Sequence, residues 1–399
     1  MATNNNNKAL NVPHLRFPEF SGEWNKCTIN DLATVVGGGT PDTTVKSYWG
    51  GDIQWFTPSE IGKNKYVDFS LRTITRDGLD NSSAKLLPLH TILLSSRATV
   101  GECSIASNEC TTNQGFQSLI AKQCNIDFLY YLIQTKKKDL IRNACGSTFL
   151  EISANEIRKI KVAVPVQNEQ EQIAKLLSLI DERIATQNKI IEKLQSLIKG
   201  LVDELMTVLL KGKLYPFSSF YIKAGEGGTP TTSVVEYYTE GTIPFIKIED
   251  LSCKYLTNNK DFITELGMQK SSAWLIPSKS VIYSNGATIG AISINEYPVC
   301  TKQGILGIVP NTNINVEYLY LLMSSSYFSK EISRIITEGT MKTAYLKDIN
   351  HIKCPLQSMA QQKNITNLTS SIEEKLSIEQ ELLRFLNLQK QYLLHMMFI

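Results

Sequence analysis

The side chains that could catalyse a reaction are scattered through this sequence rather than grouped. Its four histidines are isolated from one another: His14, His90, His351 and His395. None of them has the spacing to cysteine or carboxylate residues that a metal site requires. The serines at 95–96 and 324–326 have no acid–base partner nearby in the sequence, so a serine nucleophile has no support. The sequence therefore predicts neither a metal site nor an active site of its own.

Two glycine-rich stretches have the composition of phosphate-binding loops but not their pattern. Residues 37–39 follow a strand-like run, yet they lack the Gly-Lys-Ser/Thr ending of a phosphate loop. Residues 225–228 include Glu226, whose charge would repel a phosphate. We also find no Asn-Pro-Pro-Tyr-like motif, which an amino-methyltransferase would carry. Tight turns are the better interpretation of both glycine stretches.

Three short polar motifs occur twice, in the same order. They are Gly-Gly-Thr-Pro at 38–41 and 227–230, Ala-Thr-Val/Ile-Gly at 98–101 and 287–290, and Thr-Asn/Lys-Gln-Gly at 112–115 and 301–304. Each second copy lies 189 positions after the first, as Thr40 and Thr229 show. The spacing is constant over roughly 75 residues, which is within ordinary domain size. This indicates a duplicated domain, and two domains of one kind suit a ligand with two similar parts.

Composition sets limits on the class of protein. The 399 residues leave room for two or three domains, and 42% hydrophobic and 20% charged residues are ordinary for a folded protein. No apolar run approaches the roughly 18 residues of a membrane span, and the polar amino terminus lacks the core of a signal peptide. Eight cysteines without a Cys-x-x-Cys pair favour reduced thiols in the cytoplasm. A net charge of +3 neither proves nor excludes a polyanionic partner.

The repeat divides the chain into five parts. We expect an irregular arm at 1–25, a first domain at 26–165, a spacer helix at 166–212, a second domain at 213–356 and a second spacer helix at 357–399. Short alternating runs at 91–95 and 280–284 predict strands, while 127–142 and 316–336 predict matched helices. Each domain is therefore mixed α and β.

The segment after each domain carries a heptad pattern, with apolar residues at alternating steps of four and three. The first series is Ile173, Leu177, Ile180, Ile184, Gln187, Ile191, Leu194, Ile198, Leu201, Leu205 and Val208. The second series is Ile365, Thr369, Ile372, Leu376, Glu379, Leu383, Leu386, Lys390, Leu393 and Met397. With one polar residue in the first series and three in the second, the second is the weaker seam. Either the two helices form an antiparallel coiled coil, or each packs only on its own domain.

The motifs then resemble a known family. Gly38-Gly39-Thr40-Pro41 followed by Tyr48–Trp55 is similar to the opening of a target recognition domain, found in the DNA specificity subunits of type I restriction–modification systems. The second copy matches with 228–230, 237–238 and 241–245. Pro165-Val166-Gln167 leading to 170–174 resembles the start of the family's spacer helix, although 361–365 departs from it with extra residues.

The resemblance implies an α+β fold in which two duplicated mixed α/β target recognition domains are separated by two long helices forming an antiparallel coiled coil. It implies a non-catalytic subunit that reads a split target in double-stranded DNA, one half-site per domain. Its partners would be DNA adenine methyltransferase (modification) subunits and ATP-dependent motor-nuclease (restriction) subunits. S-adenosylmethionine, ATP and Mg²⁺ would bind those partners, so no cofactor is expected on this chain. No membrane partner is expected.

If the domains read different half-sites, residues shared by both copies cannot carry the difference. The shared residues should build turns or touch phosphate, which positions a protein without reading sequence: Thr40, Thr99, Gln114, Thr229, Thr288 and Gln303. The residues that differ are the better candidates for base contacts: Ser96 and Arg97 against Asn285 and Gly286, and Asn113 against Lys302. Arg97 could pair with guanine and Asn113 with adenine, each through two hydrogen bonds in the major groove.

Other interpretations of these residues stay open. Arg97 could instead contact phosphate or bond a carboxylate or carbonyl of its own domain, and Gln114 and Gln303 could brace their loops. Trp55 fits a core position better than a stacking platform. The basic run at 136–138 fits a solvated helix face as well as phosphate binding. Gln187 could set the helix register by meeting Glu379 or Lys390, or lie at a wet edge.

The sequence also allows two other functions. The chain could serve a self-contained methyltransferase–nuclease fusion, which a single large neighbouring reading frame would favour. It could also be a scaffold with paired modules for partners other than DNA, which its weak basicity allows. Failure to shift duplex DNA at low salt would favour the scaffold, because phosphate binding is strongest there.

Overall fold

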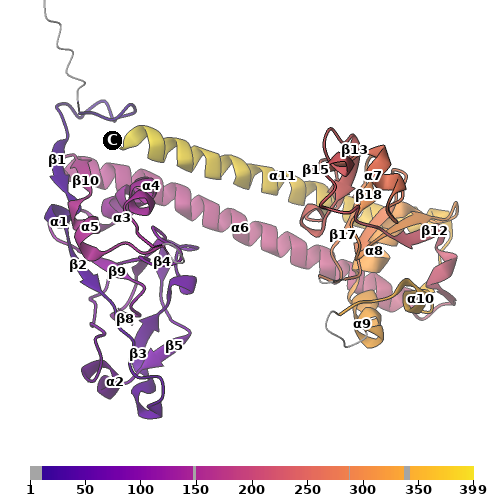
Figure 1. The fold of residues 1–399 in the computed structure, drawn as a ribbon, viewed down its shortest axis with the longest axis horizontal. Coiled ribbons are helices and arrows are strands. Elements are labelled where there is room, and N and C mark those ends of the chain that lie inside the picture. Colours follow the sequence, from indigo (N-terminus) through magenta and orange to yellow (C-terminus); the bar gives the residue numbers. More distant parts are fainter. Residues whose placement is uncertain (1–10, 147–149, 287, 337–341) are drawn as a thin grey trace, which may run out of the picture. The chain divides into compact units, whose positions relative to one another are not determined.

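A computed structural model describes residues 11–146, 150–286, 288–336 and 342–399 (Figure 1). The chain forms two compact units. Unit 1 comprises Met1–Asn188 together with Glu381–Ile399, and unit 2 comprises Lys189–Gln380. Each unit thus holds one copy of the duplicated domain and a part of both long helices.

In unit 1, short strands alternate with short helices. The strands are β1 (Asn25–Thr28), β2 (Ala33–Gly37), β3 (Trp49–Phe56), β4 (Tyr66–Val67), β5 (Arg72–Ile74), β6 (Ile92–Leu94), β7 (Cys103–Ala106), β8 (Cys110–Thr112), β9 (Gln117–Ala121) and β10 (Lys161–Val164). The helices are α1 (Ile29–Leu32), η1 (Lys46–Tyr48), η2 (Pro58–Glu60), α2 (Arg76–Asp80), α3 (Ile126–Thr135), α4 (Lys137–Arg142), α5 (Ala154–Lys159) and the long α6 (Gln167–Leu209), which continues into unit 2.

Unit 2 repeats this order of elements. Its strands are β11 (Leu214–Pro216), β12 (Tyr221–Glu226), β13 (Ile243–Ile246), β14 (Tyr255–Leu256), β15 (Asp261–Ile263), β16 (Val281–Ser284), β17 (Ile292–Asn295), β18 (Cys300–Thr301), β19 (Ile305–Pro310) and β20 (Lys353–Pro355). Its helices are η3 (Phe217–Ser219), η4 (Val235–Tyr237), η5 (Ile248–Asp250), α7 (Glu265–Gln269), α8 (Val316–Ser324), α9 (Ser326–Ile335), α10 (Leu346–Ile349) and the long α11 (Met359–Met397), which continues into unit 1.

The sheets of the two units have one topology. The larger sheet has the order β2-β9-β6-β7-β4 in unit 1 and β12-β19-β16-β17-β14 in unit 2. A smaller sheet has the order β5-β3-β8 or β15-β13-β18, and β1-β10 or β11-β20 pair at the root of each domain. Even the register repeats, because Ile92 lies opposite Ile105 and Val281 opposite Ile294. The predicted duplication and its strands at 91–95 and 280–284 are therefore confirmed.

The larger sheet is buried on both faces, which explains its continuous apolar strands. In β6, Ile92 and Leu94 join the core under α3, while Leu93 faces the smaller cluster around Phe56 and Phe116. The close packing of these faces fixes the loops at the strand ends, where the repeated motifs lie.

The two predicted domain helices are each broken in two. The expected helix at 127–142 forms as α3 and α4, and that at 316–336 forms as α8 and α9. The break in unit 2 has a local cause. Ser325 adopts an extended conformation, and its hydroxyl accepts a hydrogen bond from the backbone N–H of Phe328, so a new helix starts there.

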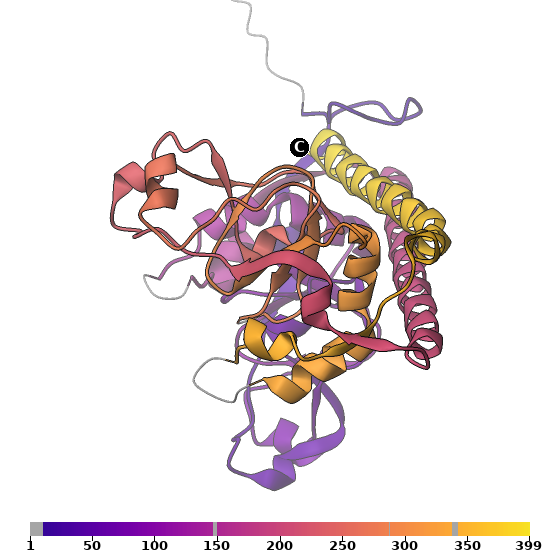
Figure 2. The same ribbon diagram turned by 90° about the vertical axis from the view of Figure 1, so that its right-hand side faces the viewer.

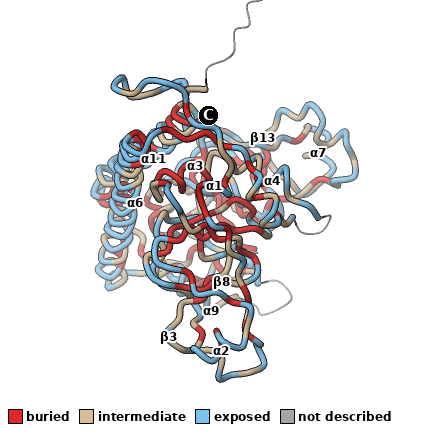
Figure 3. Tube along the Cα trace, turned by 90° about the vertical axis from the view of Figure 1, so that its left-hand side faces the viewer, coloured by how far each residue is buried: buried red, intermediate tan, exposed pale blue. Residues whose placement is uncertain are grey.

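The long helices pair antiparallel within each unit. In unit 1, Ile173 and Leu177 near the start of α6 share a core with Leu393 and Met397 near the end of α11. In unit 2, residues near the end of α6 share a core with Ile365 near the start of α11. Figure 2 shows these helices foreshortened, and many of their residues are exposed in Figure 3. The expected antiparallel coiled coil is confirmed, and packing of each helix on its own domain alone is not the arrangement.

The seam of α11 forms as predicted, because each of its ten positions is buried or half-buried. The seam of α6 holds from Ile173 to Ile198 and then shifts by one residue. Val202 and Met206 are buried in place of Leu201 and Leu205, and Val208 is 61% exposed. An α-helix turns every 3.6 residues, so a strict 3.5-residue pattern drifts around it unless the helix supercoils. The end of α6 follows the core of the unit 2 domain instead.

Candidate nucleic-acid interface

The repeated motifs meet at one end of the larger sheet in each unit. In unit 1, the backbone N–H of Gly39 donates to the carbonyl of Thr112 at 2.8 Å, and Ser96 N–H donates to Gly115 O at 2.8 Å. In unit 2, Gly228 N–H donates to Thr301 O at 3.0 Å, and Asn285 N–H to Gly304 O at 3.0 Å. In each unit, the three motifs together form one hydrogen-bonded frame, although the first and third motifs lie about 75 residues apart in the sequence.

The glycines of the Gly-Gly-Thr-Pro motif permit this close approach. A Cβ atom on Gly38 would lie 2.0 Å from the carbonyl oxygen of Asn113, and one on Gly227 would lie 2.1 Å from that of Thr301. Both contacts involve backbone atoms, which cannot rotate away. Sequence analysis predicts tight turns here, and the structure shows instead that the glycines allow two backbone segments to approach closely.

The shared threonines and glutamines brace the frame. The Thr40 hydroxyl donates to the side-chain oxygen of Gln114. In unit 2, the backbone N–H of Gln303 donates to the hydroxyl of Thr229 at 3.4 Å. The glutamines stay exposed at the tips of their loops. This arrangement matches the loop-bracing alternative and leaves their amide groups accessible.

Asn113 and Lys302 differ because the two frames close in different ways. The Asn113 side-chain oxygen accepts a hydrogen bond from Gly115 N–H at 2.8 Å. In unit 2 the matching N–H, that of Gly304, donates to Glu226 at 2.7 Å. Glu226 occupies the position that Gly37 holds in the first copy, so the two copies close the same loop with side chains from different segments. Because Glu226 accepts the hydrogen bond that closes this loop, Lys302 is not required for it, and its side chain is exposed.

Ser96 and Asn285 lie beneath the surface, which departs from their expected role in base contact. Both are buried, and each anchors the segment that leads back to the root of its domain. Ile152 N–H donates to Ser96 O at 2.9 Å, and Ala344 N–H donates to Asn285 O at 2.9 Å. The Asn285 amide also donates to Ala344 O at 3.1 Å. The difference between serine and asparagine therefore changes hydrogen bonding inside the domain, where only the asparagine adds a side-chain bond to this segment.

Arg97 is bonded within its own domain. Its Nη2 lies 2.7 Å and its Nε 3.1 Å from Oε2 of Glu151, and both side chains remain about two-fifths exposed, at 43% and 42%. An exposed pair of this kind contributes little stability, roughly 0–1 kcal/mol. Arg97 could therefore exchange this carboxylate for another acceptor at small cost.

Two threonines of the repeated turn are exposed. Thr99 follows Ala98, which has a φ of 63°, and its hydroxyl lies 2.9 Å from that of Ser95. Thr288 is the exposed counterpart in unit 2. Ala287, the first residue of the second turn motif, lies outside the described residues.

Trp55 and the lysine run have structural partners. Trp55 is 4% exposed and its indole N–H donates to Gly39 O at 2.9 Å, so the prediction of a core position is confirmed. Lys136 donates to Ile399 O at 2.7 Å, and Lys137 forms an ion pair with Glu102.

The polar residues of the helix seam also have defined places. Gln187 is buried, Lys390 forms an ion pair with Asp181, and Glu379 forms one with Lys375.

One further repeated motif, a Lys-Tyr dipeptide, is not among the residues predicted from the sequence. Lys65-Tyr66 and Lys254-Tyr255 are also 189 positions apart, and both lysines lie where a domain meets a long helix. Comparison of the two copies at the common spacing would have found them.

In the part of the chain that the structure describes, the cysteines are free thiols and no group of side chains is arranged for a metal. All eight cysteines are free. Burial raises the pKa of Cys103 and Cys110 to about 12, which keeps these thiols protonated and unreactive. Among the described residues there is no cluster of histidine, cysteine or carboxylate side chains that could hold a metal ion, and no helix long and apolar enough to cross a membrane.

Comparisons with known proteins agree with this architecture. The family model for the type I restriction modification DNA specificity domain matches twice, at residues 21–196 and 220–387. The MjaIX specificity subunit of Methanocaldococcus jannaschii is 30% identical over 357 residues, 82% of each chain. The EcoR124I/EcoR124II specificity subunit of Escherichia coli is 29% identical over 175 residues, covering 42% of this chain and 43% of that one.

Solved structures share the fold. The S subunit of a type I restriction–modification system from M. genitalium matches with a TM-score of 0.55 and 19% identity, covering 97% of this chain and 99% of that chain. The chain belongs to the family of type I restriction–modification specificity subunits. It is thus a non-catalytic component of such a system, with two target recognition domains.

Proposed function

We propose that this chain reads a bipartite target in double-stranded DNA, one half-site per recognition domain, for a cytoplasmic type I enzyme. The observation that carries the proposal is the pair of equal frames with unequal exposed side chains. Thr40 and Gln114 match Thr229 and Gln303 in the braces, whereas Asn113 and Lys302 differ between them. Shared groups suit phosphate contacts and differing groups suit base contacts.

The exposed members of the frame would make the first contacts. Gln114, Thr99 and Lys302 are exposed, and Arg97 would join them by releasing Glu151. Ser96 and Asn285 would act from beneath by holding the turns in place. With Lys302 in one frame and Asn113 in the other, the two half-sites should differ in sequence.

The long helices would dock the partner subunits. In the part of α11 that belongs to unit 1, four large apolar side chains are between 37% and 56% exposed: Leu382, Phe385, Leu388 and Tyr392. Their spacing of three to four residues gathers them on one side of the helix. Such an exposed apolar stripe is typical of a surface that a partner covers. Methyltransferase subunits would bind there and carry S-adenosylmethionine, while the motor-nuclease subunits would carry ATP and Mg²⁺.

Methylome sequencing tests the proposed function. A host that expresses this chain with its partner subunits should methylate adenines in a motif of two specific parts separated by unspecified bases. Deletion of this chain alone should remove that methylation. A continuous motif, or methylation that persists without the chain, would contradict the proposal.

Inserting one heptad into each long helix should lengthen the unspecified spacer and preserve both half-sites. The insertions are placed where the units divide, after Asn188 in α6 and after Gln380 in α11. Seven residues add roughly 10 Å of helix, which corresponds to about three base pairs of B-DNA. The motif is again read by methylome sequencing. Insertion into α6 alone is the control and should remove activity, because it puts the seam out of register. Altered half-sites, or an unchanged spacer, would show that the helices do not set the spacing.

A further inference from the structure

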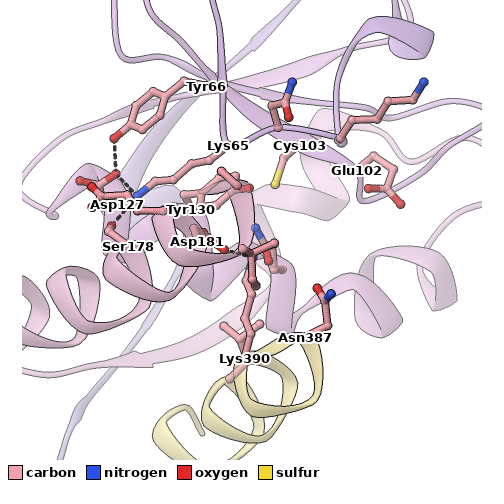
Figure 4. A pocket seen from close by; sticks show the side chains of 18 of the residues that line it. Lys65, Tyr66, Glu102, Cys103, Asp127, Tyr130, Ser178, Asp181, Asn387 and Lys390 are labelled. Carbon is pink, nitrogen blue, oxygen red and sulfur yellow. Dashed lines mark hydrogen bonds and ion pairs between the residues drawn. The ribbon is translucent and has the colours of Figure 1, made fainter. Parts of the chain in front are cut away.

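A buried lysine joins three elements at the root of the first recognition domain. The Lys65 ammonium lies 2.7 Å from Asp127 on α3 and 2.6 Å from the hydroxyl of Ser178 on α6 (Figure 4). It also lies 3.3 Å from the hydroxyl of Tyr131 on α3. Its side chain is only 9% exposed. Lys65 itself stands directly before β4, the edge strand of the larger sheet.

The network continues from the domain to both long helices. The Tyr131 hydroxyl donates to Asp181 on α6 at 2.7 Å, and Asp181 forms an ion pair with Lys390 on α11 at 2.7 Å. Tyr66 donates to Asp127 at 2.8 Å and completes the set. All of these residues belong to unit 1.

Unit 2 contains a related arrangement, in which the lysine has different acidic partners. Lys254, directly before β14, forms ion pairs with Glu373 on α11 and with Glu317 on α8, the latter at 3.5 Å. The Tyr255 hydroxyl donates to Glu317 at 2.7 Å, as Tyr66 does to Asp127. The Lys254 ammonium also lies 5.6 Å from the ring centre of Tyr320, the counterpart of Tyr131. A charged link between sheet edge, domain helix and long helix is therefore a repeated feature.

Close packing alone does not hold this junction in unit 1. A cavity of about 810 Å³ opens beside the network, and its lining includes Lys65, Asp127, Asp181 and Lys390 (Figure 4). An apolar contact is not directional, whereas an ammonium that donates to three fixed acceptors defines an angle. A buried charge is also costly when a partner moves away, so departures from that angle are penalised.

The geometry points to Lys65 and Lys254 as positioning residues that fix the angle of each recognition domain on its long helix, and thereby restrict the number of base pairs allowed between the half-sites. This inference rests on the proposed function. One extra base pair moves a half-site by about 3.4 Å and rotates it by about 35°. A domain held at a fixed angle cannot follow that rotation, and a loosened domain can.

Binding to duplexes of different spacing tests the inference. The complex of this chain with its methyltransferase partners is measured on three duplexes that carry both half-sites with the natural spacer, one base pair more, or one base pair less. Lys65→Met and Lys254→Met should each lower the preference for the natural spacer by about ten-fold, equivalent to roughly 1.4 kcal/mol. Duplexes with an altered half-site should still be rejected.

Matched variants separate positioning from folding. Lys63→Met, on an exposed lysine of the same loop, should keep the parent preference, and Lys65→Arg should restore part of it. Ser178→Ala removes the hydrogen bond from Lys65 to α6 and keeps the ion pair between Lys65 and Asp127. It should therefore lower the preference even if Lys65→Met fails to fold. An unchanged preference in these variants, or an equal loss of affinity on all three duplexes, overturns the inference. If the parent complex does not require both half-sites, the proposed function fails as well.

Discussion

Replacing Gly38 with alanine is expected to abolish recognition of one half-site and to leave the other readable. The added Cβ would meet Asn113 O at 2.0 Å and the Thr112 hydroxyl at 2.4 Å, where the first and third motifs cross. Overpacking costs typically about 1–3 kcal/mol, and a clash with backbone belongs at or above the top of that range. The frame must open to relieve it, which displaces the Thr40–Gln114 brace.

The duplicated domain supplies the complementary variant. Gly227→Ala places a Cβ 2.1 Å from Thr301 O, so it should remove the other half-site and spare the first. Gly37→Ala is the neighbouring control, because its Cβ would make only an ordinary 3.6 Å contact with the Gln117 side chain. Methylome sequencing and thermal unfolding of all three variants provide the measurements. If Gly38→Ala preserves both half-sites, the frame does not position the reading groups.

The duplication made much of this frame predictable from sequence. A common spacing of 189 positions brings corresponding residues to corresponding places, whatever the fold, so the pairing of Gly38 with Gly227 needed no structure. Heptad steps likewise predicted the seam of α11, because burial along a helix follows its period. Both predictions depend on regular local patterns.

Side-chain burial at turns could not be predicted in the same way. Ser96 and Asn285 differ in type and follow a strand, so the sequence favours them for base contact. Both nevertheless anchor a distant segment, at Ile152 and Ala344 respectively. Glu226 replaces Asn113 as the acceptor for the loop N–H although the two are distant in sequence. Such exchanges depend on tertiary proximity. The shift of the α6 seam at Val202 has the same origin, because the domain core competes there with the partner helix.

Replacing Arg16 with methionine is expected to destabilise unit 1 by about 3–5 kcal/mol, the usual effect of removing one partner of a buried ion pair. The guanidinium binds Glu169 through two hydrogen bonds of 2.8 Å each, and the Glu169 side chain is fully buried at the start of α6. Without Arg16, the carboxylate keeps the 3.3 Å hydrogen bond from the Trp24 indole as its remaining side-chain partner among the described residues. The remaining charge would be buried without adequate compensation.

Loss of the Arg16–Glu169 ion pair should also loosen the carboxyl-terminal end of α11. The arm that carries Arg16 also contacts the end of α11. Leu15 N–H donates to Met396 O at 2.8 Å, and the ring centres of Trp24 and Phe398 lie 6.3 Å apart. Releasing the arm should therefore increase hydrogen exchange over the last turns of α11, together with a lower unfolding temperature. Arg76→Met provides the control, since that arginine is 70% exposed and its loss should cost less than about 0.5 kcal/mol.

A double variant identifies the cause of the effect. Arg16→Met combined with Glu169→Met removes both charges and keeps apolar volume, and such replacements of a buried pair are often neutral. Stability should therefore recover toward that of the parent, although Arg16→Met alone is severely destabilised. If the single variant costs no more than Arg76→Met, the pair does not hold the arm. If the double variant is as unstable as the single one, the lost interaction is the packing of the arm rather than the stranded carboxylate. The end of α11 is then held by the contacts of Phe398 with Trp24 and Phe128.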